Sequence, residues 1–207
     1  MRLVIASAFG PELAPFAPDE GGHIDLGGIS ARGVAVGVGL VGAAIGAAAV
    51  ARANPSLVVF SGTCGAYPGA LSLFDVVVAE ELRLVVPAVV EGRARNPADV
   101  SPPLHAPRAP VDALVAAGAI AVRVATTPAI TIDDALAARI ALATGCAVEH
   151  LEAYAIAAAC ASFGVPFVAV LAVANRVGAA AHTEWLANHD AASRRAAAVI
   201  RAAARAL

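Results

Sequence analysis

Two side chains that could take part in chemistry stand at the expected start of a helix and at the expected end of a strand. Glu152 precedes the Ala-rich run from Ala153 to Ala161, which is typical of a helix, and an acid suits the positive end of a helix dipole. Asn175 follows the apolar run from Phe167 to Val173, which has the length of a buried strand. Ligands of open α/β sheets bind beyond such strand ends. Glu152, its apolar neighbour Leu151 and Asn175 could therefore hold a sugar and a base; alternatively, the acid only caps a helix and the amide only closes a turn.

Two glycine-rich segments could approach a ligand closely. Gly37-Val38-Gly39 is expected to join a strand over 34–38 to a helix over 41–51, but it lacks the third glycine and the downstream acid of a dinucleotide fingerprint. Gly62-Thr63-Cys64-Gly65 is expected to begin a turn that runs to Gly69 after a strand over 57–61. Its backbone N–H groups could converge on an anion or a polar ring edge. No Gly-Lys-Ser/Thr follows, so this segment is not a P-loop, and either turn could be purely structural.

The composition indicates a folded chain without affinity for nucleic acid. Hydrophobic residues make up 59% of the 207 residues and charged residues 14%, which favours a sheet buried on both faces over disorder. The formal net charge of -2 gives no electrostatic footprint for nucleic acid. The length favours a single domain over residues 1–207.

Two features bear on the cellular compartment. The uncharged segment from Val34 to Ala51 is long enough to raise the question of a membrane span, but four glycines interrupt it and no basic cluster flanks it. We expect a buried strand and helix there, and no membrane partner. Cys64, Cys146 and Cys160 are odd in number and lack the spacing of metal ligands. Structural thiols in a reducing, cytoplasmic compartment are therefore expected.

The elements that must position these residues alternate between strands and helices. Strands are expected over residues 1–6, 34–38, 57–61, 74–80, 119–125 and 167–173, and helices over 41–51, 133–143, 153–161 and the end of 181–207. A short helix carrying Glu12 is expected within 7–16, a hairpin or loop over 21–33, and a long proline-rich irregular stretch over 87–110. This alternation predicts an α/β protein with a mostly parallel central sheet.

Five stretches of the chain resemble, in the same order, the nucleoside phosphorylase/nucleosidase family. They are Gly37 to Ala44, Ser61 to Gly65, Asp75 to Val78, Ala147 to Ala157 and Gly164 to Val168. The resemblance runs along nearly the whole chain. It implies a three-layer α/β/α sandwich with a twisted, mixed, mostly parallel central sheet, a site for a purine nucleoside, no metal or organic cofactor, and a homodimer.

The resemblance also assigns roles to individual residues. The water-activating glutamate of the family falls on Glu12, and the glutamate that binds the ribose hydroxyls falls on Glu152. The substrate-binding positions fall on Val38, Thr63, Gly65 and Leu151. Cleavage of an N-glycosidic bond passes through an oxocarbenium-like sugar, as in O-glycoside hydrolysis. One carboxylate can steady that cation through the sugar hydroxyls while the other orients the attacking water.

The residue at position 175 departs from the adenine-cleaving members of the family, which carry an aspartic acid there. A protonated acid donates to purine N7 and accepts from a 6-amino group, whereas the amide of Asn175 can donate to a 6-oxo group and accept from a protonated N7. A mismatch would leave a buried polar group unpaired, at about 1–3 kcal/mol. Asn175 therefore favours a hypoxanthine-type leaving group. Within the family, the resemblance implies futalosine, a nucleoside of menaquinone biosynthesis, as the best candidate substrate.

Two further departures concern charge. Leu171 replaces an arginine of the adenine nucleosidases, and Phe60 stands where phosphorylases place a phosphate-binding arginine, which favours hydrolysis. An adenine nucleosidase, a phosphorylase and a non-catalytic nucleoside-binding member remain alternatives, although two retained carboxylates argue against a decayed site. His182 is a candidate for substrate contact, whereas His150 is expected to be a surface or core histidine.

Overall fold

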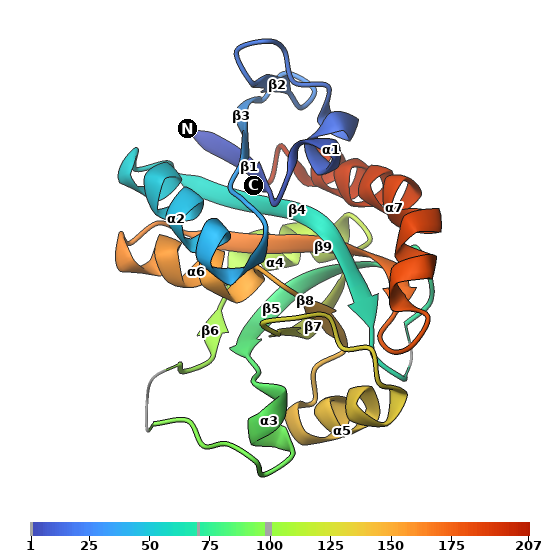
Figure 1. The fold of residues 1–207 in the computed structure, drawn as a ribbon. Coiled ribbons are helices and arrows are strands. Elements are labelled where there is room, and N and C mark those ends of the chain that lie inside the picture. Colours follow the sequence, from blue (N-terminus) through green and yellow to red (C-terminus); the bar gives the residue numbers. More distant parts are fainter. Residues whose placement is uncertain (1, 70, 98–100) are drawn as a thin grey trace.

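Nine strands form one mixed sheet, and helices cover both of its faces (Figure 1). This computed structural model describes residues 2–69, 71–97 and 101–207. The strands are β1 (Leu3–Ser7), β2 (His23–Asp25), β3 (Ser30–Ala35), β4 (Leu57–Ala66), β5 (Val76–Leu84), β6 (Leu104–His105), β7 (Ile120–Thr126), β8 (Val148–His150) and β9 (Phe167–Arg176). The helices are α1 (Gly10–Leu13), followed by a 3-10 turn (Ala14–Phe16), α2 (Gly39–Arg52), α3 (Pro87–Val90), α4 (Arg108–Ala116), α5 (Asp134–Thr144), α6 (Ala153–Ser162) and α7 (Ala181–Ala203).

The strand pairing brings several strand ends to one edge of the sheet. The order is β2-β3-β1-β4-β8-β7-β5-β6, and β9 pairs with both β4 and β5, so that β4, β8, β7, β5 and β9 form a closed circuit. Strands β3, β1, β4 and β9 run parallel to one another, and their carboxyl ends therefore lie at the same edge. Strand β8 pairs antiparallel with the last two residues of β4 and reaches this edge from the opposite direction.

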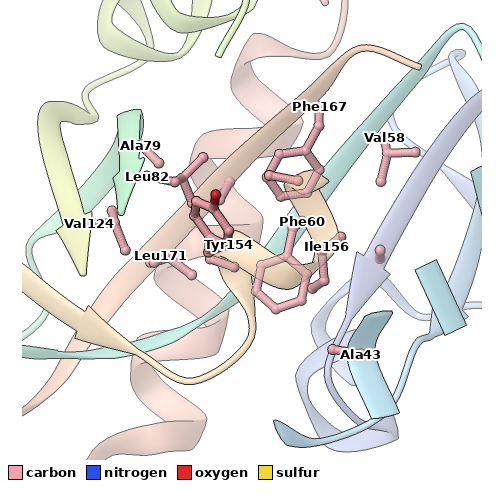
Figure 2. Packing of buried hydrophobic residues seen from close by; sticks show 14 of the residues in the cluster. Ala43, Val58, Phe60, Ala79, Leu82, Val124, Tyr154, Ile156, Phe167 and Leu171 are labelled. Atoms are coloured by element: carbon pink, nitrogen blue, oxygen red, sulfur yellow. The ribbon is translucent and has the colours of Figure 1, made fainter. Parts of the chain in front are cut away.

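Alternating side chains of the central strands fill two apolar layers. In β1, Leu3 and Ile5 pack toward α7, whereas Val4 and Ala6 pack toward the layer that contains α2 and α6. Phe60 is fully buried in that second layer, in one cluster with Ile156 and Phe167 (Figure 2). Because both faces are covered, the strands read as continuous apolar runs, and the predicted α/β class with a mixed, mostly parallel sheet is confirmed.

The structure differs from the sequence-based prediction in several places, among them the unpredicted strand β8. The segment from Gly62 to Ala66 is not a turn, because β4 continues through it with β9 on one side and β8 at its end, and an irregularity falls between Cys64 and Gly65. The strand expected over 34–38 lies earlier, as β3. The stretch over 87–110 contains α3, β6 and the start of α4, while its residues 98–100 lie outside the described residues.

The uncharged segment that raised the question of a membrane span divides into the end of β3, a loop and most of the 14-residue helix α2. Within the described ranges, every helix is too short or too polar to cross a bilayer.

Helix α2 lies unusually close to the chain that leads into it. A Cβ atom at Gly46 would stand 1.9 Å from the carbonyl oxygen of Val36, whereas a Cβ at Gly42 would have its nearest neighbour at 3.7 Å. Only a glycine at position 46 therefore allows this approach. This close approach also fixes the start of α2, where the backbone N–H of Gly39 donates to Glu152.

We expect Gly46→Ala to destabilise the protein by at least about 1–3 kcal/mol, because the clash is with backbone and cannot be relieved by a rotamer change. Gly42→Ala is the matched control in the same helix. It should be neutral or stabilising by up to about 1 kcal/mol, since alanine loses less conformational entropy in a helix. Urea unfolding of both variants measures the difference, and equal stabilities would contradict the close approach.

Candidate active site

A cavity of about 390 Å³ opens at the edge where the strand ends meet. Its wall draws on β4, β8 and β9, the helix α1, the loops that follow β1, β3, β7 and β8, and the start of α7. It is lined by Ala8, Phe9, Glu12, Val38, Thr63, Cys64, Gly65, Ile130, Glu149, His150, Leu151, Glu152, Asn175, Ala181, His182 and Trp185.

Glu12 is buried at the end of β1, on the short helix α1 that Pro11 helps to begin. Its Oε1 atom accepts hydrogen bonds from the backbone N–H of Thr63 at 3.0 Å and from the Thr63 hydroxyl at 3.1 Å. Its Oε2 atom has no partner among the described residues. Burial raises the pKa of Glu12 to about 7, and the nearby Glu152 adds to this, while the two bonds from Thr63 oppose it. A carboxyl group with such a pKa can act as an acid or a base near neutral pH.

Trp185, the only tryptophan, supports this carboxylate from α7. Its indole N–H donates to the Thr63 hydroxyl at 3.1 Å, and that hydroxyl donates in turn to Glu12. The indole also stacks on His189, with ring centroids 4.5 Å apart. The position and orientation of Glu12 are therefore set by a chain of donors that begins on a different element.

Glu152 lies opposite Glu12, at the start of α6. Its Oε1 atom accepts the backbone N–H of Gly39 at 2.8 Å, which ties the start of α6 to the start of α2. Its Oε2 atom lies 3.3 Å from His150 Nδ1. That nitrogen already accepts the backbone N–H groups of Glu152 and Ala153, at 3.0 and 3.1 Å, so it carries no proton for the carboxylate. The contact is therefore not an ion pair, and Oε2 is left to face the cavity.

Glu149 is a third buried carboxylate with a different role. Its oxygens accept from the backbone N–H and the hydroxyl of Thr131, and from the Tyr67 hydroxyl at 2.9 Å. These bonds fasten the loop after β7, which carries Ile130 to the cavity. With both oxygens occupied, Glu149 is a structural anchor.

Asn175 is placed by two small features of its surroundings. Its side-chain N–H₂ donates to the carbonyl oxygen of Arg176 at 2.9 Å, which leaves Oδ1 and the second N–H for the cavity. A Cβ at Gly65 would stand 2.8 Å from Asn175 Nδ2 and from Val177. Gly65 therefore makes room for the side chain of Asn175.

The remaining wall is apolar and carries no fixed cation. Val38 and Leu151 form part of it, and Phe60 lies behind it, fully buried with its ring 5.2 Å from that of His150 in an edge-to-face arrangement. Among the residues described, no arginine or lysine lines the cavity. The same part of the chain holds no group of three His, Cys, Asp or Glu side chains that could bind a metal ion.

All seven residues proposed from the sequence lie around this one cavity: Glu12, Val38, Thr63, Gly65, Leu151, Glu152 and Asn175. His182 lines it as well. His150 is a buried residue of the cavity wall and not a surface histidine. Sequence reasoning gave no role to Trp185, whose only signal was its position ten residues after Asn175. Cys64, Cys146 and Cys160 are buried free thiols, as expected.

The chain belongs to the phosphorylase superfamily, whose family model matches residues 8–205. A search of curated proteins finds no match. Among solved structures, the fold is similar to that of futalosine hydrolase from Helicobacter pylori strain 26695, at 16% identity and a TM-score of 0.86, with 100% of this chain and 98% of that chain covered. It is also similar to S-adenosylhomocysteine nucleosidase from Streptococcus pyogenes in complex with 5-methylthiotubericidin, at 21% identity and a TM-score of 0.88, covering 100% and 97%.

The pKa of Glu12 leads to a prediction about stability. Between its unfolded value near 4.5 and its folded value of about 7, the folded state holds the proton more tightly, so the free energy of unfolding falls as the pH rises. Glu12→Gln removes this penalty and its Oε1 can keep both bonds from Thr63. At pH 8 the variant should be more stable than the wild type by up to about 3 kcal/mol, and at pH 4.5 the difference should vanish. Denaturant unfolding at both pH values measures it; a pH-independent difference would contradict the raised pKa.

Proposed function

We propose that the protein is a purine nucleoside N-ribosyl hydrolase that favours a 6-oxopurine leaving group, with futalosine as its best candidate substrate. The observation that carries this proposal is the pair of buried carboxylates, Glu12 and Glu152, that face one cavity from two sides. Each is held through Oε1, which leaves its Oε2 atom for a ligand. Buried carboxylates without a cationic partner are costly, and they are typical of sites that use them.

The geometry supports a division of labour between the two acids. Glu152 Oε2 accepts the ribose hydroxyls, and the apolar side chain of Leu151 packs under the sugar. The C1′–N9 bond breaks with its electron pair moving to the base, and the cationic sugar is steadied by the carboxylate of Glu152. A water bound at Glu12 forms the new bond to C1′ and gives its proton to the carboxylate of Glu12.

The amide of Asn175 supports the choice of leaving group. Its second N–H can donate to a 6-oxo group, while Oδ1 accepts from a protonated N7. The exposed side chain of Ile130 stands at the same cavity as an apolar cover for the ring. The similar solved structures include a futalosine hydrolase and an S-adenosylhomocysteine nucleosidase, and the proposal assigns the base preference of this chain to Asn175.

Hydrolysis is favoured over phosphorolysis because, among the described residues, no arginine or lysine lines the cavity. An attacking phosphate would need a cation, and Phe60 is buried in the apolar core where phosphorylases of the family place their arginine. A neutral water needs no such partner.

A cytoplasmic homodimer is part of the proposal. Val38, Val41 and Ile45 form an apolar stripe at the start of α2 with exposed fractions of 64%, 75% and 69%. The stripe continues from the cavity wall, and a second copy of the chain would cover it.

Purified protein incubated with futalosine, inosine and 5′-methylthioadenosine, with and without phosphate, tests the function. We expect release of hypoxanthine from futalosine at a rate that does not depend on phosphate. Glu12→Gln is the matched control and should lower kcat by about 10²–10⁴ while remaining folded. A ribose-1-phosphate product whose yield follows phosphate concentration would make the protein a phosphorylase, and full activity of the variant would remove Glu12 from the mechanism.

Asn175→Asp should shift kcat/KM from hypoxanthine-bearing toward adenine-bearing substrates by roughly ten- to a hundredfold. The reason is that the acid pairs with the 6-amino group of adenine and leaves the 6-oxo group of hypoxanthine without a donor, whereas the amide does the reverse. The acid would stand against the carbonyl oxygen of Arg176, which favours its protonated form. Leu171 limits the gain, since it supplies no polar support from β9. Steady-state kinetics on inosine and adenosine measure the shift, and an equal loss on both would make Asn175 purely structural.

A further inference from the structure

The two ring nitrogens of His150 have different surroundings. Nδ1 accepts the backbone N–H groups of Glu152 and Ala153, and thereby caps α6, whose N-cap residue makes no side-chain cap of its own. A nitrogen that accepts two N–H groups carries no proton, so the proton of the neutral ring sits on Nε2. The fold thus fixes the tautomer of this imidazole.

The Nε2 side of the ring points toward Glu12. The site where a Cβ of residue 62 would stand lies 3.4 Å from His150 Nε2 and 3.4 Å from Glu12 Oε1, so Gly62 keeps open the space that both groups border. The ring of Phe60 packs against His150 and fixes its plane. The described residues supply no acceptor for Nε2, although His150 is only 6% exposed. Because His150 lines the cavity, this free donor can meet a water or a ligand that enters there.

We propose that His150 is a catalytic residue that donates from Nε2–H to the nucleophilic water, which in turn donates to the free Oε2 of Glu12. This inference rests on the proposed hydrolase function and deepens it. A buried water needs two or more polar partners. The opening at Gly62 is bordered by His150 Nε2 and by Glu12 Oε1, and the other oxygen of the same carboxylate, Oε2, has no partner among the described residues. One lone pair of the water accepts from His150 and the other attacks C1′. The water proton passes to Glu12, the C1′–N9 electron pair goes to the base, and His150 keeps its own proton throughout.

The electrostatics agree with a neutral donor. Burial lowers the pKa of His150, and the opposing effect of Glu152 is smaller. Protonation at Nδ1 would also break the two bonds that cap α6. His150 therefore orients the water and is not the general acid that protonates the base.

Two substitutions separate this role from the capping role. In His150→Asn the amide oxygen can take the place of Nδ1, so the cap is kept and the donor toward Glu12 is lost. In His150→Gln the amide nitrogen reaches the place of Nε2, so the donor is kept and the cap is weakened. We expect Asn to retain the Tm and to lower kcat about 10–100-fold, and Gln to lower the Tm and to retain a kcat at least tenfold above that of Asn.

The outcomes are distinct. If kcat follows Tm, so that Asn is as active as Gln or more so, His150 is only a helix cap and the inference is overturned. If the wild type hydrolyses no purine nucleoside, the proposed function fails instead. ¹⁵N NMR of the imidazole in the wild-type protein provides an independent check: a proton on Nε2 alone at pH 7 supports the inference, and a proton on Nδ1 overturns it whatever the activity.

Discussion

The antiparallel pairing of β8 with the last residues of β4 is the constraint on which the site depends. Strand β8 has only three residues, yet it turns the chain so that Glu149, His150 and Glu152 arrive beside the ends of β1 and β9. The arrangement requires β4 to have no side chain at two positions. Gly62 leaves space for Glu12 and His150, and Gly65 leaves space for Asn175. The glycines of this segment therefore make space for neighbouring side chains. They do not form the turn that was predicted from the sequence.

The three buried carboxylates show how hydrogen bonding separates support from chemistry. Glu149 has both oxygens occupied by Thr131 and Tyr67, and it holds a loop in place. Glu12 and Glu152 are each held at a single oxygen, by backbone N–H groups of Thr63 and Gly39. A carboxylate held in this way is fixed in position but not satisfied. The difference could not be read from the sequence, in which all three are glutamates at the start or end of an apolar run.

Local patterns in the sequence were sufficient for some of the long elements. The apolar run of β9 and the Ala-rich α6 were predicted within a few residues, because burial on both faces and helix propensity act locally. The continuation of β4 and the existence of β8 were missed. Glycine-rich and three-residue segments have no strand pattern of their own, and only their partners make them strands. Glu152, Leu151 and Asn175 were singled out from their places at a helix start and a strand end, and Glu12 was assigned its role by resemblance to a family. The capping bonds of His150 and the contact of Trp185 with Thr63 instead join positions that only the fold brings together.

The position of Trp185 gives the molecule an internal optical reporter. The chain has a single tryptophan, and its indole stands in the cavity wall, bonded to Thr63 and stacked on His189. Tryptophan emission therefore arises from one site, next to the carboxylate that the mechanism requires. Filling of the cavity, and the order in which base, sugar and water enter and leave it, can be followed by fluorescence in the unlabelled protein.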